Sequence, residues 1–211
     1  MLHTETVEPR TFSLLKELLN MQGLERFYLV GGTALSLIYG HRKSIDIDLF
    51  SAEKFETQQI VEVLSGYFKG RIFIEQKPPQ FGIFCFIDDV KVDLVRHPHP
   101  LIAPAKIIEE VRMFSLEVII AMKEQAILGR GNKKDFWNIA ELLAHYSVED
   151  FIRFHQQKYT TQNVLISVPQ AITYFKDAEE TEETEDPVSL KNQTWTGIQR
   201  AISQRVSQYL H

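Results

Sequence analysis

Two aspartates separated by one residue are the first sign of chemistry in this sequence. Asp46 and Asp48 lie in the stretch IDIDLF, residues 45–50, which alternates apolar and acidic residues as strands do. Successive side chains of a strand point to opposite faces, so both carboxylates project from one face, roughly 6.6 Å apart. Such a pair suits Mg²⁺ or Mn²⁺, which prefer oxygen ligands. The alternative is an edge strand whose acidic residues face water.

A pair of glycines lies upstream of the two aspartates. The apolar run 27–30 predicts a buried strand that ends in Gly31 and Gly32, and a short helix over 33–39 follows at once. Glycines permit close approach of the backbone, and a helix N-terminus offers N–H groups and partial positive charge to a phosphate. Thr33 adds a hydroxyl there. A Gly-Gly pair alone is also consistent with an ordinary tight turn.

A third carboxylate occurs in another predicted strand. In VKVDLV, residues 90–95, Lys91 and Asp93 face one way while Val92 and Leu94 face the other. On a neighbouring strand, Asp93 would complete a metal site or accept the proton of an attacking hydroxyl. Alone it would more simply be a charge facing solvent. Just beyond it, His97 and His99 lack a third ligand at zinc spacing, so we expect them at most to border the cleft.

The elements that must position these residues change in type along the chain. Helices are predicted over 8–20, 33–39 and 55–68, and strands over 27–30, 45–50, 72–75, 82–87 and 90–95. Asp88 and Asp89 form a predicted hairpin turn between the last two strands. Beyond Pro98, Pro100 and Pro104 the pattern is helical, with helices predicted over 116–128, 134–145, 148–157, 163–175 and 194–210.

These segments predict an α/β (α+β) fold. We expect a mixed sheet with flanking helices over 1–104, followed by an all-helical domain over 105–211. The acidic stretch at about 177–187 is predicted to be a loop of that second domain.

Composition limits the cellular setting and the partners. The net charge of −5 argues against extensive non-specific binding to nucleic acid, but it does not exclude a local basic cleft. A single cysteine, Cys85, excludes an internal disulfide and is interpreted as core packing. No apolar run approaches the roughly 20 residues that span a bilayer. The segment MLHTETVEPR lacks the basic start and the apolar stretch of a signal peptide. We therefore expect a cytoplasmic protein without a membrane partner.

The order of these motifs resembles that of the polymerase-β nucleotidyltransferase superfamily. More closely, the sequence is similar to the AbiEii-type nucleotidyltransferase toxins, over about residues 27–145. The motifs that carry the likeness are GGTAL, HRKSIDIDLF, VKVDLV, the helix around Lys123 and KDFWNIAEL. The first two together are specific, and the last two would be weak alone.

The resemblance implies a role for each matching residue. It implies that Gly31, Gly32 and Thr33 form a turn that contacts phosphate. His41, Arg42 and Ser44 match the basic and polar segment that precedes the metal-binding strand in the family. Asp46, Asp48 and Asp93 would be the metal ligands. Lys123 would face the nucleotide triphosphate, and Asp135 would be the acidic residue of the last motif. Asn138 departs from the pattern, because many relatives carry aspartate there, which puts an ionic role at that position in question.

The activity implied by the resemblance is transfer of a nucleoside monophosphate from an NTP to a hydroxyl, with Mg²⁺ or Mn²⁺. The protein would be the nucleotide-binding toxin of a type IV toxin–antitoxin system, with the 3′ end of a tRNA as acceptor and an antitoxin protein as partner. Two alternatives stay open. One is a transferase that modifies small molecules such as aminoglycosides, or protein hydroxyls, and the other is a silent module that binds a nucleotide or a partner without catalysis.

Overall fold

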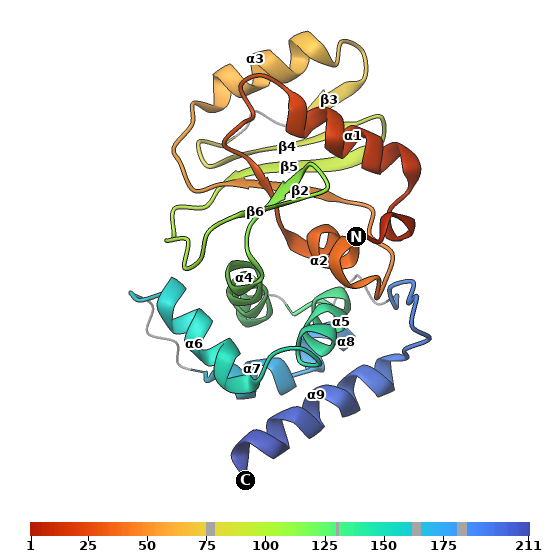
Figure 1. Ribbon diagram of the computed structural model, residues 1–211, viewed down its shortest axis with the longest axis vertical. Helices are drawn as coiled ribbons and strands as arrows, with labels where there is room; N and C mark the ends of the chain where they lie inside the picture. Colours follow the sequence, from red (N-terminus) through yellow and green to blue (C-terminus); the bar gives the residue numbers. More distant parts are fainter. Residues whose placement is uncertain (75–78, 130, 162–165, 181–184) are drawn as a thin grey trace.

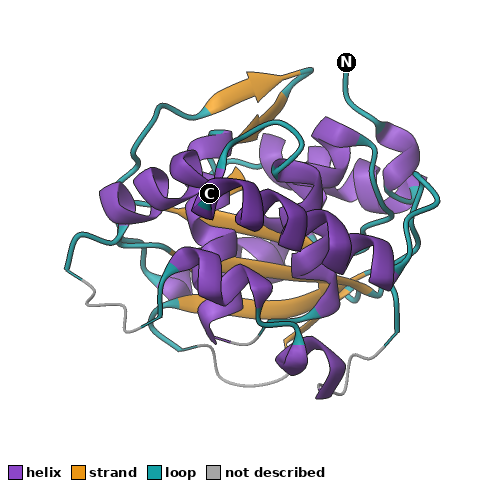
Figure 2. Cartoon of the chain, turned by 90° about the horizontal axis from the view of Figure 1, so that it is seen from below, coloured by secondary structure: helices purple, strands orange, loops and turns teal. Residues whose placement is uncertain are grey.

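The centre of the protein is a seven-stranded mixed sheet with the strand order β3-β4-β5-β2-β1-β7-β6. The computed structural model describes residues 1–74, 79–129, 131–161, 166–180 and 185–211. Helices α1 and α3 lie over one face of the sheet, whereas α2 and the C-terminal helices lie on the other side (Figure 1). Seen from the C-terminal side, the helices cover the sheet as a layer (Figure 2). The predicted fold class, a mixed sheet with flanking helices followed by a helical half, is confirmed.

The strands are short and most of them lie in the first half of the chain. Their bounds are β1 Tyr28–Leu29, β2 Ile47–Ser51, β3 Ile72–Ile74, β4 Gly82–Ile87, β5 Val90–Arg96, β6 Lys106–Ile108 and β7 Val111–Met113. The helices are η1 Thr4–Thr6, α1 Pro9–Asn20, α2 Gly31–Tyr39, α3 Thr57–Tyr67, α4 Leu116–Gly129, α5 Lys133–Leu142, α6 Val148–Lys158, α7 Val168–Thr173, α8 Lys176–Glu180 and α9 Trp195–Leu210.

Alternation along β2 and β5 separates the core from the site. Ile47 and Leu49 of β2, with Val92 and Leu94 of β5, are fully buried. The residues between them point to the opposite face, because side chains alternate along a strand. Cys85 on β4 is also buried, and burial raises the pKa of its thiol to about 12, so its interpretation as core packing is confirmed.

The predicted hairpin at Asp88 and Asp89 is confirmed. Strands β4 and β5 are antiparallel and join through these two residues, both with positive φ, 48° and 62°. Two consecutive left-handed residues match the right-handed twist of the flanking strands. Aspartate tolerates this region better than most side chains do, which explains the turn without glycine.

The sheet extends beyond the predicted boundary of the first domain. β6 and β7 follow the three prolines, and β7 pairs in parallel with β1. The run of helices in the second half of the chain therefore begins at Leu116, after two strands that the sequence did not predict. Strands of three residues are too short to show alternation of apolar and polar residues. The three prolines, which indicate a break in the chain, were therefore the stronger signal in this region.

The segment that leads into β2 differs from its prediction in one residue. In a strand over 45–50, alternation would put Ile45 on the core side with Ile47, opposite to Asp46 and Asp48. Ile45 is instead 65% exposed, because β2 begins only at Ile47. The preceding loop is held by the distant C-terminal segment, since Lys43 donates its backbone N–H to Val188 and Leu190 donates to His41.

Several predicted segments of the helical half are observed with small shifts. α4, α5, α6 and α9 occupy the predicted helical stretches, whereas α7 is shorter than its prediction. Residues 75, 163–165 and 181–184 of the predictions lie outside the described residues, and part of the predicted acidic loop forms α8. No helix in the described ranges is long and apolar enough to cross a membrane.

Candidate functional site

Two of the predicted carboxylates are direct neighbours on the sheet. β2 and β5 run in parallel, and their register places Asp48 opposite Asp93. Residues paired in this way share one face of a sheet. Asp46 lies one residue before β2 and thus at the edge of the same face. The structure therefore brings the predicted third carboxylate beside the first pair.

Asp48 is partly buried among like charges. Burial raises the pKa of its carboxyl to about 6, and the negative charges of Asp93 and Asp46 act in the same direction, against the opposing charge of Lys123. Among the described residues no group of three or more His, Cys, Asp and Glu side chains is gathered tightly enough to hold a metal. A repelling pair of carboxylates nevertheless fits a divalent cation, since Mg²⁺ is typically held by one or two carboxylates together with substrate phosphates.

The Gly31-Gly32 turn packs directly against the site. A Cβ atom on Gly31 would lie 2.2 Å from Oδ2 of Asp48, and one on Gly32 would lie 2.1 Å from Nη2 of Arg42. Gly31 also has a φ of +72°, a conformation that costs other residues energy. It is the first residue of α2, so the free N–H groups of that helix terminus face the carboxylate strand.

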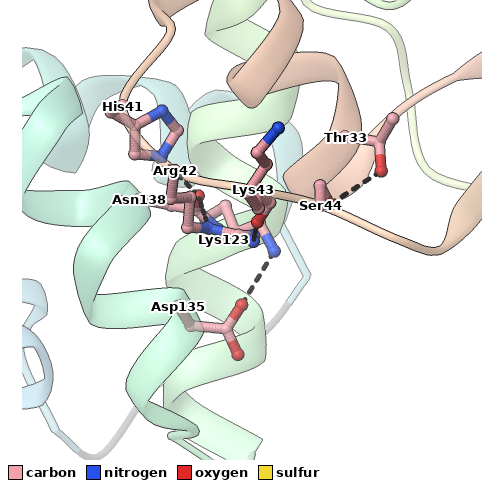
Figure 3. Close-up of polar contacts among 8 residues, drawn as sticks. All are labelled: Thr33, His41, Arg42, Lys43, Ser44, Lys123, Asp135 and Asn138. Atoms are coloured by element: carbon pink, nitrogen blue, oxygen red, sulfur yellow. Dashed lines mark hydrogen bonds and ion pairs between the residues drawn. The ribbon is translucent and has the colours of Figure 1, made fainter. Parts of the chain in front are cut away.

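Thr33 positions the segment that carries Asp46. Its hydroxyl donates to the backbone carbonyl of Asp46. The same hydroxyl lies 2.8 Å from Oγ of Ser44 (Figure 3). Thr33 and Ser44 are both buried. The hydroxyl proton of Thr33 is therefore used inside the protein, and the implied contact between Thr33 and a phosphate stays a prediction.

Arg42 is a buried cation that joins the sheet to the helical half. Its Nε donates to Oδ1 of Asn138 over 3.1 Å, and its Nη1 donates to the carbonyl of Lys43 over 2.7 Å (Figure 3). Burial lowers the pKa of the guanidinium, whereas Asp135, Asp46 and Asp48 raise it. A guanidinium stays charged in proteins, so these carboxylates balance it from a distance.

Asn138 serves as a neutral acceptor for two donors. Its Oδ1 also lies 2.9 Å from Nε2 of His41, and burial lowers the pKa of His41 to about 4. The imidazole is therefore neutral, and its Nε2 donates a proton to the amide oxygen. Asparagine can fill this position because the charge of Arg42 is balanced by other carboxylates, which accounts for the departure from the family pattern.

Replacing Asn138 with leucine should destabilise the protein. We expect the free energy of unfolding to fall by about 2–3 kcal/mol, because the buried Arg42 and His41 both lose their acceptor. Urea denaturation measures this change. Asn20→Leu is the matched control, because that side chain is exposed and donates to the carbonyl of Lys16 at the surface, and its effect should stay within about 0.5 kcal/mol. An unchanged urea midpoint for Asn138→Leu would contradict this role.

Lys123 and Asp135 form an ion pair on the helical side of the site. Nζ of Lys123 on α4 lies 2.7 Å from Oδ1 of Asp135 on α5 (Figure 3). The Lys123 side chain is 12% exposed and that of Asp135 only 1%. Asp135 therefore lies behind the lysine and positions its ammonium group, so any action of Asp135 on a substrate passes through Lys123.

A cavity of about 470 Å³ brings Gly31, Asp48 and Lys123 together. Its lining also includes His97, which the sequence placed at the border of the cleft, and Phe50 and Tyr159, which the sequence did not assign to the site. Phe50 follows Asp48 by two residues on the same strand face, so the alternation of β2 held a signal for it. Tyr159 lies just beyond α6 and had no such signal.

Comparison with known proteins gives the family. The sequence matches the family described as nucleotidyl transferase AbiEii toxin, Type IV TA system, over residues 13–205. Uncharacterized protein aq_aa25 of Aquifex aeolicus (strain VF5) is 28% identical over 191 residues, which cover 87% of this chain and 88% of that protein.

Solved structures share the fold at low sequence identity. JHP933 from Helicobacter pylori is 14% identical with a TM-score of 0.54, over 96% of this chain and 92% of that chain. The nucleotidyltransferase toxin MenT4, Rv2826c from Mycobacterium tuberculosis H37Rv, is 14% identical with a TM-score of 0.58, over 92% of this chain and 79% of that chain. Because the family match spans most of its length, the chain belongs to the AbiEii family of nucleotidyltransferase toxins of type IV toxin–antitoxin systems.

Proposed function

We propose that this nucleotidyltransferase uses Mg²⁺ or Mn²⁺ to transfer a nucleoside monophosphate from an NTP to a hydroxyl group of RNA, with the 3′ end of a tRNA as acceptor. The observation that carries the proposal is the opposition of Asp48 and Asp93 across β2 and β5, next to the Gly31 turn and Lys123. In such a reaction the protein mainly aligns the reactants and balances charge.

Asp46, Asp48 and Asp93 are the residues that would hold the divalent cation. When bound, the cation neutralises charge on the transferring phosphoryl group. The acceptor oxygen forms a bond to the α-phosphorus while the bond between that phosphorus and the oxygen leading to the β-phosphate breaks, which releases pyrophosphate. The carboxylate of Asp93 would also accept the proton of the attacking hydroxyl.

The leaving pyrophosphate needs positive charge on the opposite side of the site from the acceptor. Lys123 and the N–H groups at the start of α2 supply it, and Asp135 holds the lysine there. Arg42 adds a buried positive charge behind Gly32. Displacement at phosphorus is in line, so the acceptor approaches from the side of Asp93.

An aromatic surface lies on that side and supports a nucleic-acid acceptor. Phe84 on β4 is opposite Asp93 in the sheet register and is 37% exposed. Phe73 on β3, paired with Phe86, shares the same face and is 63% exposed. Exposed aromatic rings on a sheet are a common platform for unpaired bases, which stack on them with little dependence on sequence. This arrangement favours RNA over an aminoglycoside as acceptor.

Replacing Phe84 with alanine should weaken binding of the RNA acceptor. We expect the KM for RNA to rise roughly 5- to 100-fold, because a stacked base contributes about 1–3 kcal/mol, while the KM for the NTP stays the same. Initial rates measure both values, with RNA varied at saturating NTP for the first and NTP varied at saturating RNA for the second. Tyr67→Ala is the control, since Tyr67 is also an exposed aromatic residue, at 55%, but lies on α3, over the other face. An unchanged KM for RNA would place the acceptor elsewhere.

The proposed function is tested with labelled NTPs, Mg²⁺ or Mn²⁺ and total RNA. We expect pyrophosphate release together with label at RNA 3′ ends. Label found only on protein or on small molecules would rule out the RNA acceptor but keep the enzyme class. The lack of pyrophosphate release with every NTP and acceptor would favour the silent binding module. We further propose a cytoplasmic site of action and an antitoxin protein as partner, in line with the family.

A further inference from the structure

The cavity beside Asp48 has two chemically different ends. At one end lie the groups suited to phosphate, which are the Gly31 turn and Lys123. The other end is lined by the rings of Phe50, His97 and Tyr159, which come from β2, the end of β5 and the end of α6. The rings of Phe50 and His97 are 5.9 Å apart, and those of His97 and Tyr159 are 6.4 Å apart and perpendicular.

Most of the remaining lining of the cavity is apolar. Val30, Ile119, Met122 and Ala126 line the same cavity. A pocket of this kind suits a flat, uncharged ring, and its few polar groups decide which ring is accepted. Those polar groups are His97 and Gln125. The amide oxygen of Gln125 lies 3.2 Å from Nε2 of His155, which holds the side chain in place.

His97 is held firmly and is uncharged. Its backbone N–H donates to the carbonyl of Ser51 over 2.7 Å. Its Nε2 is buried and has no hydrogen-bond partner among the described residues. Burial lowers the pKa of the imidazole to about 3, and the charge of Lys158 and the ring of His99 act in the same direction. A neutral imidazole offers one donor and one acceptor, which suits the edge of a base and not a phosphate.

We infer that this aromatic end of the cavity is the subsite for the nucleobase of the incoming NTP, and that His97 selects among the four bases. The inference rests on the proposed nucleotidyl transfer. The base belongs to the NTP and not to the acceptor because Lys123 and Gly31 line the same cavity, whereas the acceptor approaches over Asp93 and Phe84. A base whose edge cannot form hydrogen bonds with His97 leaves buried polar groups without a partner. This cost is how such sites discriminate between bases.

The test compares His97→Phe with His99→Phe. Phenylalanine keeps a ring beside Phe50 but removes both nitrogens of His97. His99 is the matched control, because it also contacts Tyr159, at 4.7 Å between ring centroids, but does not line the cavity. The dissociation constants of ATP, GTP, CTP and UTP are measured by titration calorimetry with Mg²⁺ and without acceptor, and then kcat/KM for each NTP with acceptor.

We expect His97→Phe to change the ratio between the best and the worst NTP roughly tenfold, in binding and in kcat/KM. His99→Phe should leave this ratio unchanged. Lys123→Ala should weaken all four NTPs by one common factor, since it acts on the phosphates. A ratio that does not change in His97→Phe would overturn the inference, and so would a change confined to the KM of the acceptor.

A second variant keeps the test valid if His97→Phe does not fold. Phe50→Leu should weaken all four uncharged nucleosides as competitors of NTP binding, whereas Lys123→Ala should not change nucleoside binding. Nucleosides unaffected by Phe50→Leu would overturn the inference. Binding is measured without turnover, so the two proposals can fail separately. A ratio change in His97→Phe, together with no pyrophosphate release by the wild-type protein, would contradict the proposed function alone.

Discussion

Asp48→Asn should lower nucleotidyl transfer roughly 10³-fold or more and should also make the folded protein more stable at pH 7.5. The loss follows because the variant removes a carboxylate that would hold the divalent cation, and with it the neutralisation of charge on the transferring phosphoryl group. The gain follows from the raised pKa of Asp48, about 6, since burial and neighbouring carboxylates disfavour its ionised form. A carboxyl whose pKa is raised by folding destabilises the native state above that pKa, and asparagine removes this penalty.

Pyrophosphate release and urea denaturation measure the two effects of Asp48→Asn. Asp89→Asn is the matched control, because it removes one carboxylate from the β4–β5 turn, where its φ of 62° suits asparagine equally well. We expect the control to keep both activity and stability. An Asp48→Asn protein that retains activity would show that the Asp48 carboxylate does not take part in catalysis. A loss of stability would show that the carboxylate is favourably paired in the native state.

Gly31→Ala should lower activity roughly 100-fold or more. The added Cβ would lie 2.2 Å from Oδ2 of Asp48, so the carboxylate or the start of α2 must move. A misplacement of about 1 Å in a catalytic site costs roughly a hundredfold in rate. The φ of +72° adds strain of about 1–2 kcal/mol for a residue with a Cβ, so stability should fall as well.

Gly66→Ala is the matched control for this substitution. Gly66 lies in α3, and a Cβ there would meet nothing within 4 Å. Alanine restricts the unfolded chain and favours the helix, so we expect a stability gain of about 0.5–1 kcal/mol and full activity. Activity assays and thermal unfolding of both variants are the measurements. If Gly31→Ala behaves like Gly66→Ala, the glycine turn is not packed against the carboxylate in solution.

Local sequence patterns were sufficient for most of the elements. Alternation in β2 and β5 predicted which side chains leave the core, and helical spacing predicted α4, α5, α6 and α9 within a few residues. The sequence did not predict the strands β6 and β7, and it placed Ile45 on the wrong side, because the alternating pattern is short at these positions. β6 and β7 have three residues each, and Ile45 precedes the start of its strand, so neither carried a reliable period.

The functions of individual side chains depended on contacts between distant segments. Thr33 and Asp135 were predicted by resemblance to act in the site, but the first bonds Ser44 and the second lies behind Lys123. Asn138 departs from the aspartate of the family pattern, and its contacts explain why. Its side-chain oxygen accepts hydrogen bonds from both Arg42 and His41. None of these partners is marked by spacing, because each pair joins elements that only the tertiary fold brings together.

The sequence by itself determined the fold class, the family and the residue types of the site, because strand alternation and the glycine pair are local properties. Only the tertiary structure decided that Asp48 faces Asp93, since strand register depends on how the whole sheet assembles. It also decided that Phe50, His97 and Tyr159 share a cavity with Lys123. The reason is that the helical half packs on the sheet and closes the cavity between segments more than a hundred residues apart, which no local pattern encodes.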